Sequence, residues 1–132
     1  MPVTRADQVN ASFVEAMNAG DLDRALEIWS PQTVFVTQPG SEAVRGTAAL
    51  REALQAFLDL KPTLRFESLQ FIEADDIAFE SIRWTLEGTG PDGEPVRMVA
   101  IDGNVLRRLD DGRWVTVIDN PFHSEHIGLA VE

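Results

Sequence analysis

The sequence predicts an α+β domain in which three N-terminal helices pack on one face of a mostly antiparallel sheet. A change in hydrophobic period along the chain predicts this class. Up to residue 60, apolar residues recur three and four positions apart, which is the spacing of one helix face. From Pro62 onward they alternate with polar residues, as on half-buried strands. Helices followed by consecutive strands are typical of helices that cover one face of an antiparallel sheet.

A predicted hairpin around Asp110-Asp111-Gly112 supports this class. Asp-Gly between two apolar-rich runs favours a tight hairpin. The second run, 114–118, reads Trp-Val-Thr-Val-Ile and is almost wholly β-branched or aromatic, as a packed strand should be. Asp119-Asn120-Pro121 then ends the strand, because proline cannot donate to the ladder.

Length, charge and cysteine content restrict the class of protein. The 132 residues fit one domain, 1–132. The absence of cysteine excludes disulfides, thiolate metal sites and a cysteine nucleophile. A formal net charge of −11 argues against nucleic-acid and anionic-membrane partners, which bind basic surfaces. The sequence shows neither a membrane-spanning run nor the apolar core of a signal peptide. We therefore expect a cytoplasmic protein without a nucleic-acid or membrane partner, and predict no cofactor.

Two helices are predicted in the first thirty residues or so. Thr4 and Asp7 have the spacing of a capping box, which opens a helix over 5–19. Asp21 is placed to cap a short second helix that carries Trp29, and a Ser-Pro pair ends it.

The predicted third helix follows a short strand over 34–36 and a turn over 38–41. It covers 48–60, with Thr47 as its N-cap. Pro62 prevents it from continuing, because the residue before a proline avoids helical geometry.

Four strands in a meander complete the predicted fold, over 63–73, 77–87, 96–109 and 114–118. Alternate residues of the second strand form an apolar face. The single exception on that face is a carboxylate, Glu80.

Five segments of the chain carry a resemblance to a known family. They are 13–29, 34–36, Val44-Arg45-Gly46, Asp111-Gly112-Arg113-Trp114 and Ile118-Asp119-Asn120-Pro121-Phe122. With them the chain resembles the nuclear transport factor 2-like (NTF2-like) superfamily, and within it the SnoaL-like branch of the SgcJ/EcaC type. The resemblance implies a conical half-barrel, in which helices close a strongly curved sheet over a blind apolar pocket. It also implies frequent pairing into dimers.

The chain departs from the ketosteroid isomerases, which share the fold that the resemblance implies. In those enzymes an aspartate just before a proline is the general base, and a tyrosine and a second acid hold the oxyanion. Here Gln38 precedes Pro39, and the chain has no tyrosine. Both departures argue against isomerase chemistry of that type.

The faces of Asp102 and Asn104 depend on the turn at Asp111-Gly112. A two-residue turn places Asn104 opposite Asp119, so that all three polar side chains share a face. A three-residue turn with a glycine bulge pairs Leu109 with Arg113. Gly103 and Val105 then share the face of Asp119, which is the single carboxylate on it. The sequence leaves both registers open.

Two carboxylates have alternative explanations. Glu80 either faces a dry pocket, is paired with an arginine such as Arg97 or Arg107, or lies near a rim with access to water, and we expect the arginine pair. Asp119 either acts in the pocket or closes its strand by accepting hydrogen bonds from the backbone beyond Pro121.

The sequence therefore predicts a small-molecule pocket protein. It is an acid–base cyclase, isomerase or dehydratase acting on a small apolar, polyketide-like molecule, or alternatively a non-catalytic ligand-binding or dimerisation module. A homodimer through the sheet is expected, because apolar residues occupy both faces of the last strands. His123 and His126 lack a third ligand, so no metal site is predicted. The candidate catalytic residues are Asp119, Asn104, Asp102 and Glu80, and the candidate ligand-binding residues are Trp29, Phe35, Phe57, Phe66, Trp84 and Val117.

Overall fold

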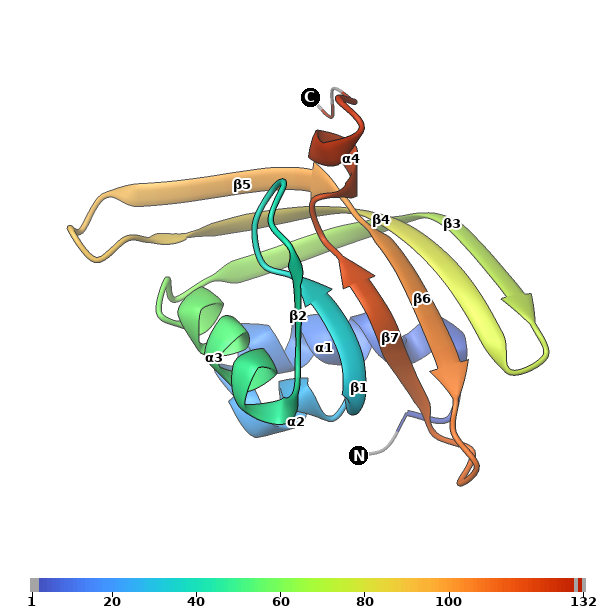
Figure 1. The fold of residues 1–132 in the computed structure, drawn as a ribbon. Helices are drawn as coiled ribbons and strands as arrows, with labels where there is room; N and C mark the ends of the chain where they lie inside the picture. The colour runs from blue at the N-terminus through green and yellow to red at the C-terminus, as the bar shows by residue number, and fades with distance from the viewer. Residues whose placement is uncertain (1–2, 130, 132) are drawn as a thin grey trace.

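A computed structural model describes residues 3–129 and 131, and within them the predicted α+β class is confirmed (Figure 1). The described part contains four α-helices, one 3-10 helix and one seven-stranded sheet. The elements in chain order are η1 (Ala6–Gln8), α1 (Val9–Asn18), α2 (Leu22–Leu26), β1 (Trp29–Val36), β2 (Ala43–Arg45), α3 (Thr47–Leu58), β3 (Thr63–Ala74), β4 (Ile77–Thr89), β5 (Pro95–Ile101), β6 (Gly103–Arg108), β7 (Trp114–Asn120) and α4 (His123–His126).

The sheet is mostly antiparallel, as predicted, with one parallel pair between β1 and β7. Its strand order is β2-β1-β7-β6-β4-β3, and β5 pairs with the second half of β4. Figure 1 shows the strongly curved sheet with α1, α2 and α3 gathered on its concave side. The short C-terminal helix α4 contacts β5.

The start of the first helix differs from the prediction. Residues 6–8 form a 3-10 turn, and its N-cap, Arg5, has no side-chain capping hydrogen bond. Asp7 is instead paired with the Arg5 guanidinium at 2.8 Å, so the capping box of Thr4 and Asp7 is wrong. The predicted cap of the second helix is confirmed, since the Arg24 amide donates to Asp21 Oδ1 at 3.1 Å.

Trp29 begins β1 and does not belong to the second helix. The cause is a set of contacts with β7, in which the Thr33 hydroxyl donates to the Thr116 carbonyl at 2.7 Å and the Thr116 amide donates to Ile28 O at 2.7 Å. Pro31 lies within β1 where the register with β7 shifts, a position that needs no amide donor.

The third helix begins one residue earlier than predicted. Its N-cap is Gly46, whose φ of 94° favours glycine, and Thr47 is the first helical residue and not the cap. The preceding β2 was not predicted. It is only three residues long and pairs with the end of β1.

The predicted strand 96–109 is interrupted at Asp102, although both halves keep one register with β4. The Ile82 amide donates to Asp102 Oδ1 at 2.8 Å, so this carboxyl group accepts a bond that a strand carbonyl normally accepts. β3 has an irregularity between Ser68 and Gln70, and Ser68 pairs with Ile82. Such irregularities bend a strand, and the sheet bends sharply between β5 and β6 (Figure 1).

The hairpin between β6 and β7 combines features of both alternatives. The Leu109 amide donates to the Arg113 carbonyl at 2.7 Å, which identifies the three-residue turn. A second irregularity farther along leaves Val117 without a partner on β6. This extra residue shifts the pairing by one, so that Asn104 lies opposite Asp119 after all.

One hydrophobic core lies between the helices and the concave face of the sheet. Leu50 and Leu54 of α3, Val9 of α1 and Leu106 of β6 are among its most deeply buried side chains. No helix in the described part of the chain is long and apolar enough to cross a membrane.

Candidate functional site

Three predicted site residues form a row across three neighbouring strands. Glu80 of β4 pairs with Asn104 of β6, and Asn104 pairs with Asp119 of β7. Asp102 lies two residues before Asn104 and faces the same side. All four side chains belong to residues that are at most 9 % exposed. The structure therefore gathers three carboxyl groups and one amide on the concave face.

Asp102 is held by two hydrogen bonds from the protein. Its Oδ1 accepts from the Ile82 amide at 2.8 Å, and its Oδ2 accepts from Asn104 Nδ2 at 3.0 Å. Burial is the main cause that raises the pKa of Asp102 to about 8, and the nearby charge of Asp119 adds to it. The two hydrogen bonds act in the opposite direction but do not offset the burial.

Asp119 accepts one side-chain hydrogen bond, from Trp29 Nε1 to its Oδ2 at 3.3 Å. Burial raises the pKa of Asp119 to about 7, and the indole N–H partly counteracts this rise. None of the described hydrogen bonds joins its carboxylate to the backbone beyond Pro121. The strand-closing alternative for Asp119 is therefore wrong, and the carboxyl group is directed at the interior.

Glu80 lies in the same row, and no ion pair joins it to an arginine in the part of the chain that the structure describes. Its Oε2 accepts a hydrogen bond from the Ser68 hydroxyl at 3.0 Å, which replaces the expected pair with Arg97 or Arg107. Burial raises the pKa of Glu80, while the Ser68 hydrogen bond lowers it. Arg107 cannot pair with Glu80, because its side chain and that of its strand partner Ile77 lie on the opposite face of the sheet.

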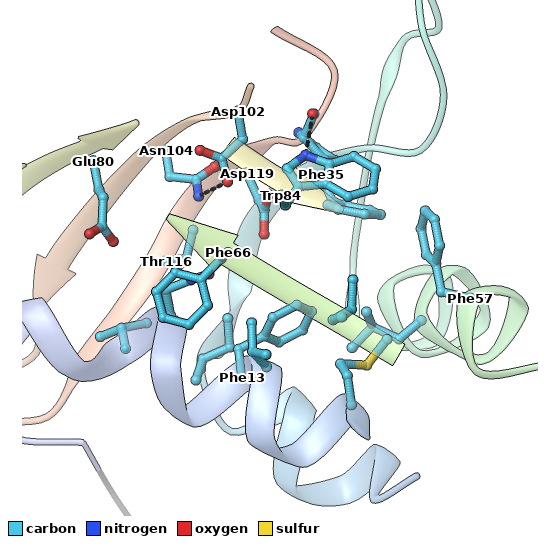
Figure 2. A pocket seen from close by; sticks show the side chains of 18 of the residues that line it. Phe13, Phe35, Phe57, Phe66, Glu80, Trp84, Asp102, Asn104, Thr116 and Asp119 are labelled. Atoms are coloured by element: carbon cyan, nitrogen blue, oxygen red, sulfur yellow. Dashed lines mark hydrogen bonds between the residues drawn. The ribbon is translucent and has the colours of Figure 1, made fainter. Parts of the chain in front are cut away.

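These polar groups line a cavity of about 80 Å³ whose other walls are mostly apolar, the exceptions being Asn10, Arg65 and Thr116. Figure 2 shows Asp102, Asn104 and Asp119 together, with Glu80 and Phe57 at opposite sides and Phe13 on the helix below. Of the predicted ligand-binding residues, Phe35, Phe57, Phe66 and Trp84 line this cavity.

Two predicted ligand-binding residues do not line it. Trp29 lies behind the wall, stacked on Phe13 at 6.4 Å and tilted against Phe35 at 4.8 Å between ring centroids. Val117 is the unpaired residue of the β7 irregularity, and Thr116 takes the cavity-lining position instead. The prediction for Val117 assumed regular alternation, which the irregularity breaks.

Helix α1 contributes cavity residues that the sequence did not single out. Its apolar stripe predicted a buried face but did not show whether that face meets the core or a cavity. Asn10 on this helix lines the cavity, and its Nδ2 is buried without a hydrogen-bond partner in the described part of the structure. A ligand can accept that hydrogen bond. The α1 residues in the lining are Val9, Asn10, Phe13, Val14 and Met17.

The arrangement suits proton transfer better than metal binding. Two neighbouring carboxyl groups with pKa values of about 7 and 8 differ in their readiness to lose a proton near neutral pH. The described residues include no group of three or more histidines or acids that could hold a metal ion. His123 and His126 lie on the four-residue helix α4, and neither lines the cavity.

The comparison with protein families agrees with the fold. A sequence model described as the SnoaL-like domain matches residues 11–117. The chain belongs to the SnoaL-like family. No curated protein matches this SnoaL-like domain significantly.

Solved structures share the fold of this SnoaL-like domain at low sequence identity. A ketosteroid isomerase-like protein from Erwinia carotovora atroseptica superposes with a TM-score of 0.74 at 18% identity, over 86% of this chain and 88% of the other. A candidate dehydratase of the NTF2-like family from Streptomyces avermitilis gives 0.69 at 19%, over 86% and 89%. A candidate calcium/calmodulin-dependent protein kinase type II association domain from Thiobacillus denitrificans gives 0.71 at 19%, over 91% and 94%. These likenesses establish the NTF2-like fold alone.

Gln38 of this SnoaL-like domain lies apart from the carboxyl groups. Its carbonyl accepts from the Ser41 amide at 3.2 Å in the turn after β1. It lines a separate groove outside the carboxyl-lined cavity. A proton acceptor for a molecule in this cavity must therefore come from Asp102, Asp119 or Glu80.

Proposed function

We propose that this SnoaL-like domain is an acid–base catalyst for a small, largely apolar molecule of the polyketide-like ketone class. Asp119 is the proton acceptor and Asp102 is the proton or hydrogen-bond donor. The observation that carries the proposal is that both carboxyl groups face one apolar cavity with pKa values near neutrality. Perturbed, buried titratable groups in a cavity are typical of catalytic sites.

The two carboxyl groups are coupled, because the charge of Asp119 raises the pKa of Asp102. The pair therefore shares one proton near neutral pH, and we assign this proton to Asp102 and the ionised state to Asp119. The Asp119 carboxylate removes a proton from the carbon next to a ketone, and the electron pair moves onto the ketone oxygen. Asp102 donates its hydrogen bond to that oxygen as negative charge develops there. Return of the proton to the same or another carbon completes an exchange or an isomerisation.

Cyclisation, dehydration and isomerisation of ketones can share this first step, so the geometry supports the reaction class and not one product. Asn104 holds Asp102 by its 3.0 Å hydrogen bond and so fixes the donor relative to the acceptor. Asn10 on the facing helix supplies a further donor for the bound molecule.

The second candidate function is a non-catalytic module that binds the same type of molecule. Two features favour it. The chain has no tyrosine to stabilise an oxyanion, and Gln38 stands where the related isomerases carry their base. Binding without proton transfer would use the same cavity.

Hydrogen exchange separates the two candidates. Cyclohexanone is one ring in size, and its α-hydrogens are replaced by deuterium in D₂O on proton abstraction, which NMR detects. We expect the parent protein to accelerate this exchange and Asp119→Asn to lose about a hundredfold or more of the acceleration. Asp75→Asn is the matched control, because Asp75 is exposed and its φ of 53° is one that asparagine adopts readily. Equal exchange by the parent and Asp119→Asn would support binding without chemistry.

We also propose that the domain forms a homodimer through the convex face of the sheet. Ile72, Phe79, Val105 and Ile118 pair successively across four strands and form a continuous apolar stripe there. Ile72, Phe79 and Ile118 are between 37 % and 52 % exposed. A row of large apolar side chains on the solvent side of a sheet marks an interface. A second copy presents the same stripe and can cover it by two-fold symmetry.

A further inference from the structure

The carboxyl-lined cavity is too small for more than one ring. Its free volume is about 80 Å³, and one water-sized group needs roughly 10–15 Å³ of such space. The cavity therefore admits about five to eight non-hydrogen atoms. Sites for drug-sized ligands have volumes of about 300–1,000 Å³. The cavity alone falls below this range.

A larger groove lies directly beside it. This groove has a volume of about 620 Å³ and runs between α3, β5 and the segment that enters α4. Ala53 and Ala56 of α3 form part of its floor, and their small side chains leave the space open. Met98 and Leu60 add apolar surface, while Gln38, Arg97 and Glu125 add polar and charged groups to the lining. Most of the exposed groove surface is apolar, which suits a hydrocarbon body more than a charged one.

Phe57 and Trp84 line both spaces and so form the partition between them. Trp84 is fixed, because its Nε1 donates to the Pro121 carbonyl at 2.8 Å and its ring meets Phe122 edge-on at 5.7 Å. Phe57, by contrast, has no side-chain hydrogen bond that fixes it. It meets Phe35 edge-on at 6.3 Å and packs against the core from the penultimate position of α3. Rotation of the Phe57 ring would join the two spaces.

We propose that the ligand of this domain is an elongated amphiphile whose polar ring occupies the carboxyl-lined cavity and whose apolar chain or second ring passes Phe57 into the groove beside α3. This inference rests on the proposed function for the polar ring and adds the substrate class. The cavity and groove together reach the volume of a drug-sized site, and the side chains of Phe57 and Trp84 line both. Phe57 is then a specificity-determining residue.

A series of 4-alkylphenols tests the proposal by calorimetric titration. Phenol fits the cavity, and the ethyl, butyl and hexyl members extend the chain. We expect the dissociation constant to fall by roughly fourfold per methylene beyond ethyl, because each buried methylene contributes about that factor. Ala56→Trp fills the groove from an exposed helix position and should abolish this gain while phenol binds as before. Glu52→Trp, exposed on α3 and outside the groove lining, is the control and should keep the gain.

Each other outcome has a definite meaning. If phenol binds and the longer members bind no more tightly, the extended ligand is excluded while the proposed cavity function stands. A gain that survives Ala56→Trp would show that the chain lies elsewhere and would equally overturn the proposal. If no member binds to the parent protein, both the ligand class and the proposed function are wrong.

Discussion

Asn104 lies directly opposite Asp119 because two irregularities of the β6–β7 hairpin act in sequence. The three-residue turn alone would place Gly103 opposite Asp119, and the unpaired Val117 shifts the register by one residue. The consequence is that Asn104, Asp119 and Asp102 share one face. One strand irregularity thus decides whether the cavity contains one carboxyl group from this hairpin or two.

The rate of α-hydrogen exchange should show a narrow bell-shaped dependence on pH. Asp119 must be ionised, so the rate rises as pH increases through about 7. Asp102 must be protonated, so the rate falls as pH increases through about 8. Measurement of cyclohexanone exchange between pH 5 and 10, at constant buffer concentration and with the buffer rate subtracted, checks both limbs. A rate that rises steadily with pH would show hydroxide catalysis and would exclude the assigned roles.

Replacing Trp29 by phenylalanine should raise the pKa of Asp119 further above its ordinary value. The indole N–H donates to Asp119 Oδ2 and lowers this pKa, while the ring stack with Phe13 and Phe35 survives the change. The shift is followed by NMR titration of the Asp119 carboxyl carbon. Trp84→Phe is the control, because its indole bonds the Pro121 carbonyl and not Asp119. If the pKa of Asp119 is the same in the parent protein and in Trp29→Phe, Trp29 does not influence the protonation of Asp119.

Replacing Glu80 by glutamine should leave the melting temperature at pH 8 unchanged or raise it. The pKa of Glu80 is raised in the folded state, so the protonated form is favoured there and the carboxyl group destabilises the fold increasingly as pH rises above its unfolded pKa. The amide removes this penalty and still accepts from Ser68. The advantage should vanish near pH 4, where the parent carboxyl group is protonated in both states. A fall of several degrees at pH 8 would reveal a cationic partner.

Glu67→Gln is the matched comparison for that change. Glu67 is exposed on β3 and pairs with Arg83 at 3.0 Å. Loss of an exposed ion pair costs about 0–1 kcal/mol, so this variant should be slightly less stable than the parent at pH 8. The two glutamate variants therefore differ in sign.

Ile118→Lys should convert the proposed dimer into a monomer. The new ammonium group would lie in the apolar stripe between two sheets, where burying an unpaired charge is unfavourable. Ile127→Lys is the control, because Ile127 is also an exposed isoleucine, 57 % against 48 % for Ile118, but lies just after α4, outside the stripe. Sedimentation velocity at micromolar concentration measures the change. A parent protein that sediments as a monomer would defeat the dimer proposal.

The sequence predicted much of the fold because its local signals agree with the tertiary structure. The alternation of 77–87 places Ala78, Glu80 and Ile82 on the buried face. The Asp21 cap also follows from local chemistry alone. Trp29 was misassigned because its strand forms through long-range contacts with β7, and no local pattern reports those contacts.

The sequence predicted which residues belong to the candidate site but not how they are arranged in space. Asp102, Asn104, Asp119 and Glu80 stood out because polar side chains interrupt apolar strands. Their convergence depends on the unpaired Val117, which regular alternation cannot anticipate. Phe13 had no distinguishing signal, because a cavity wall and a packed core use the same apolar helix stripe.

NMR titration of protein labelled at the aspartate carboxyl carbons tests the central claim most directly. We predict two carboxyl resonances with midpoints of about 7 and about 8, the first absent from Asp119→Asn and the second from Asp102→Asn. If every aspartate titrates near 4, neither carboxyl group lies in a dry cavity, and the acid–base account is contradicted.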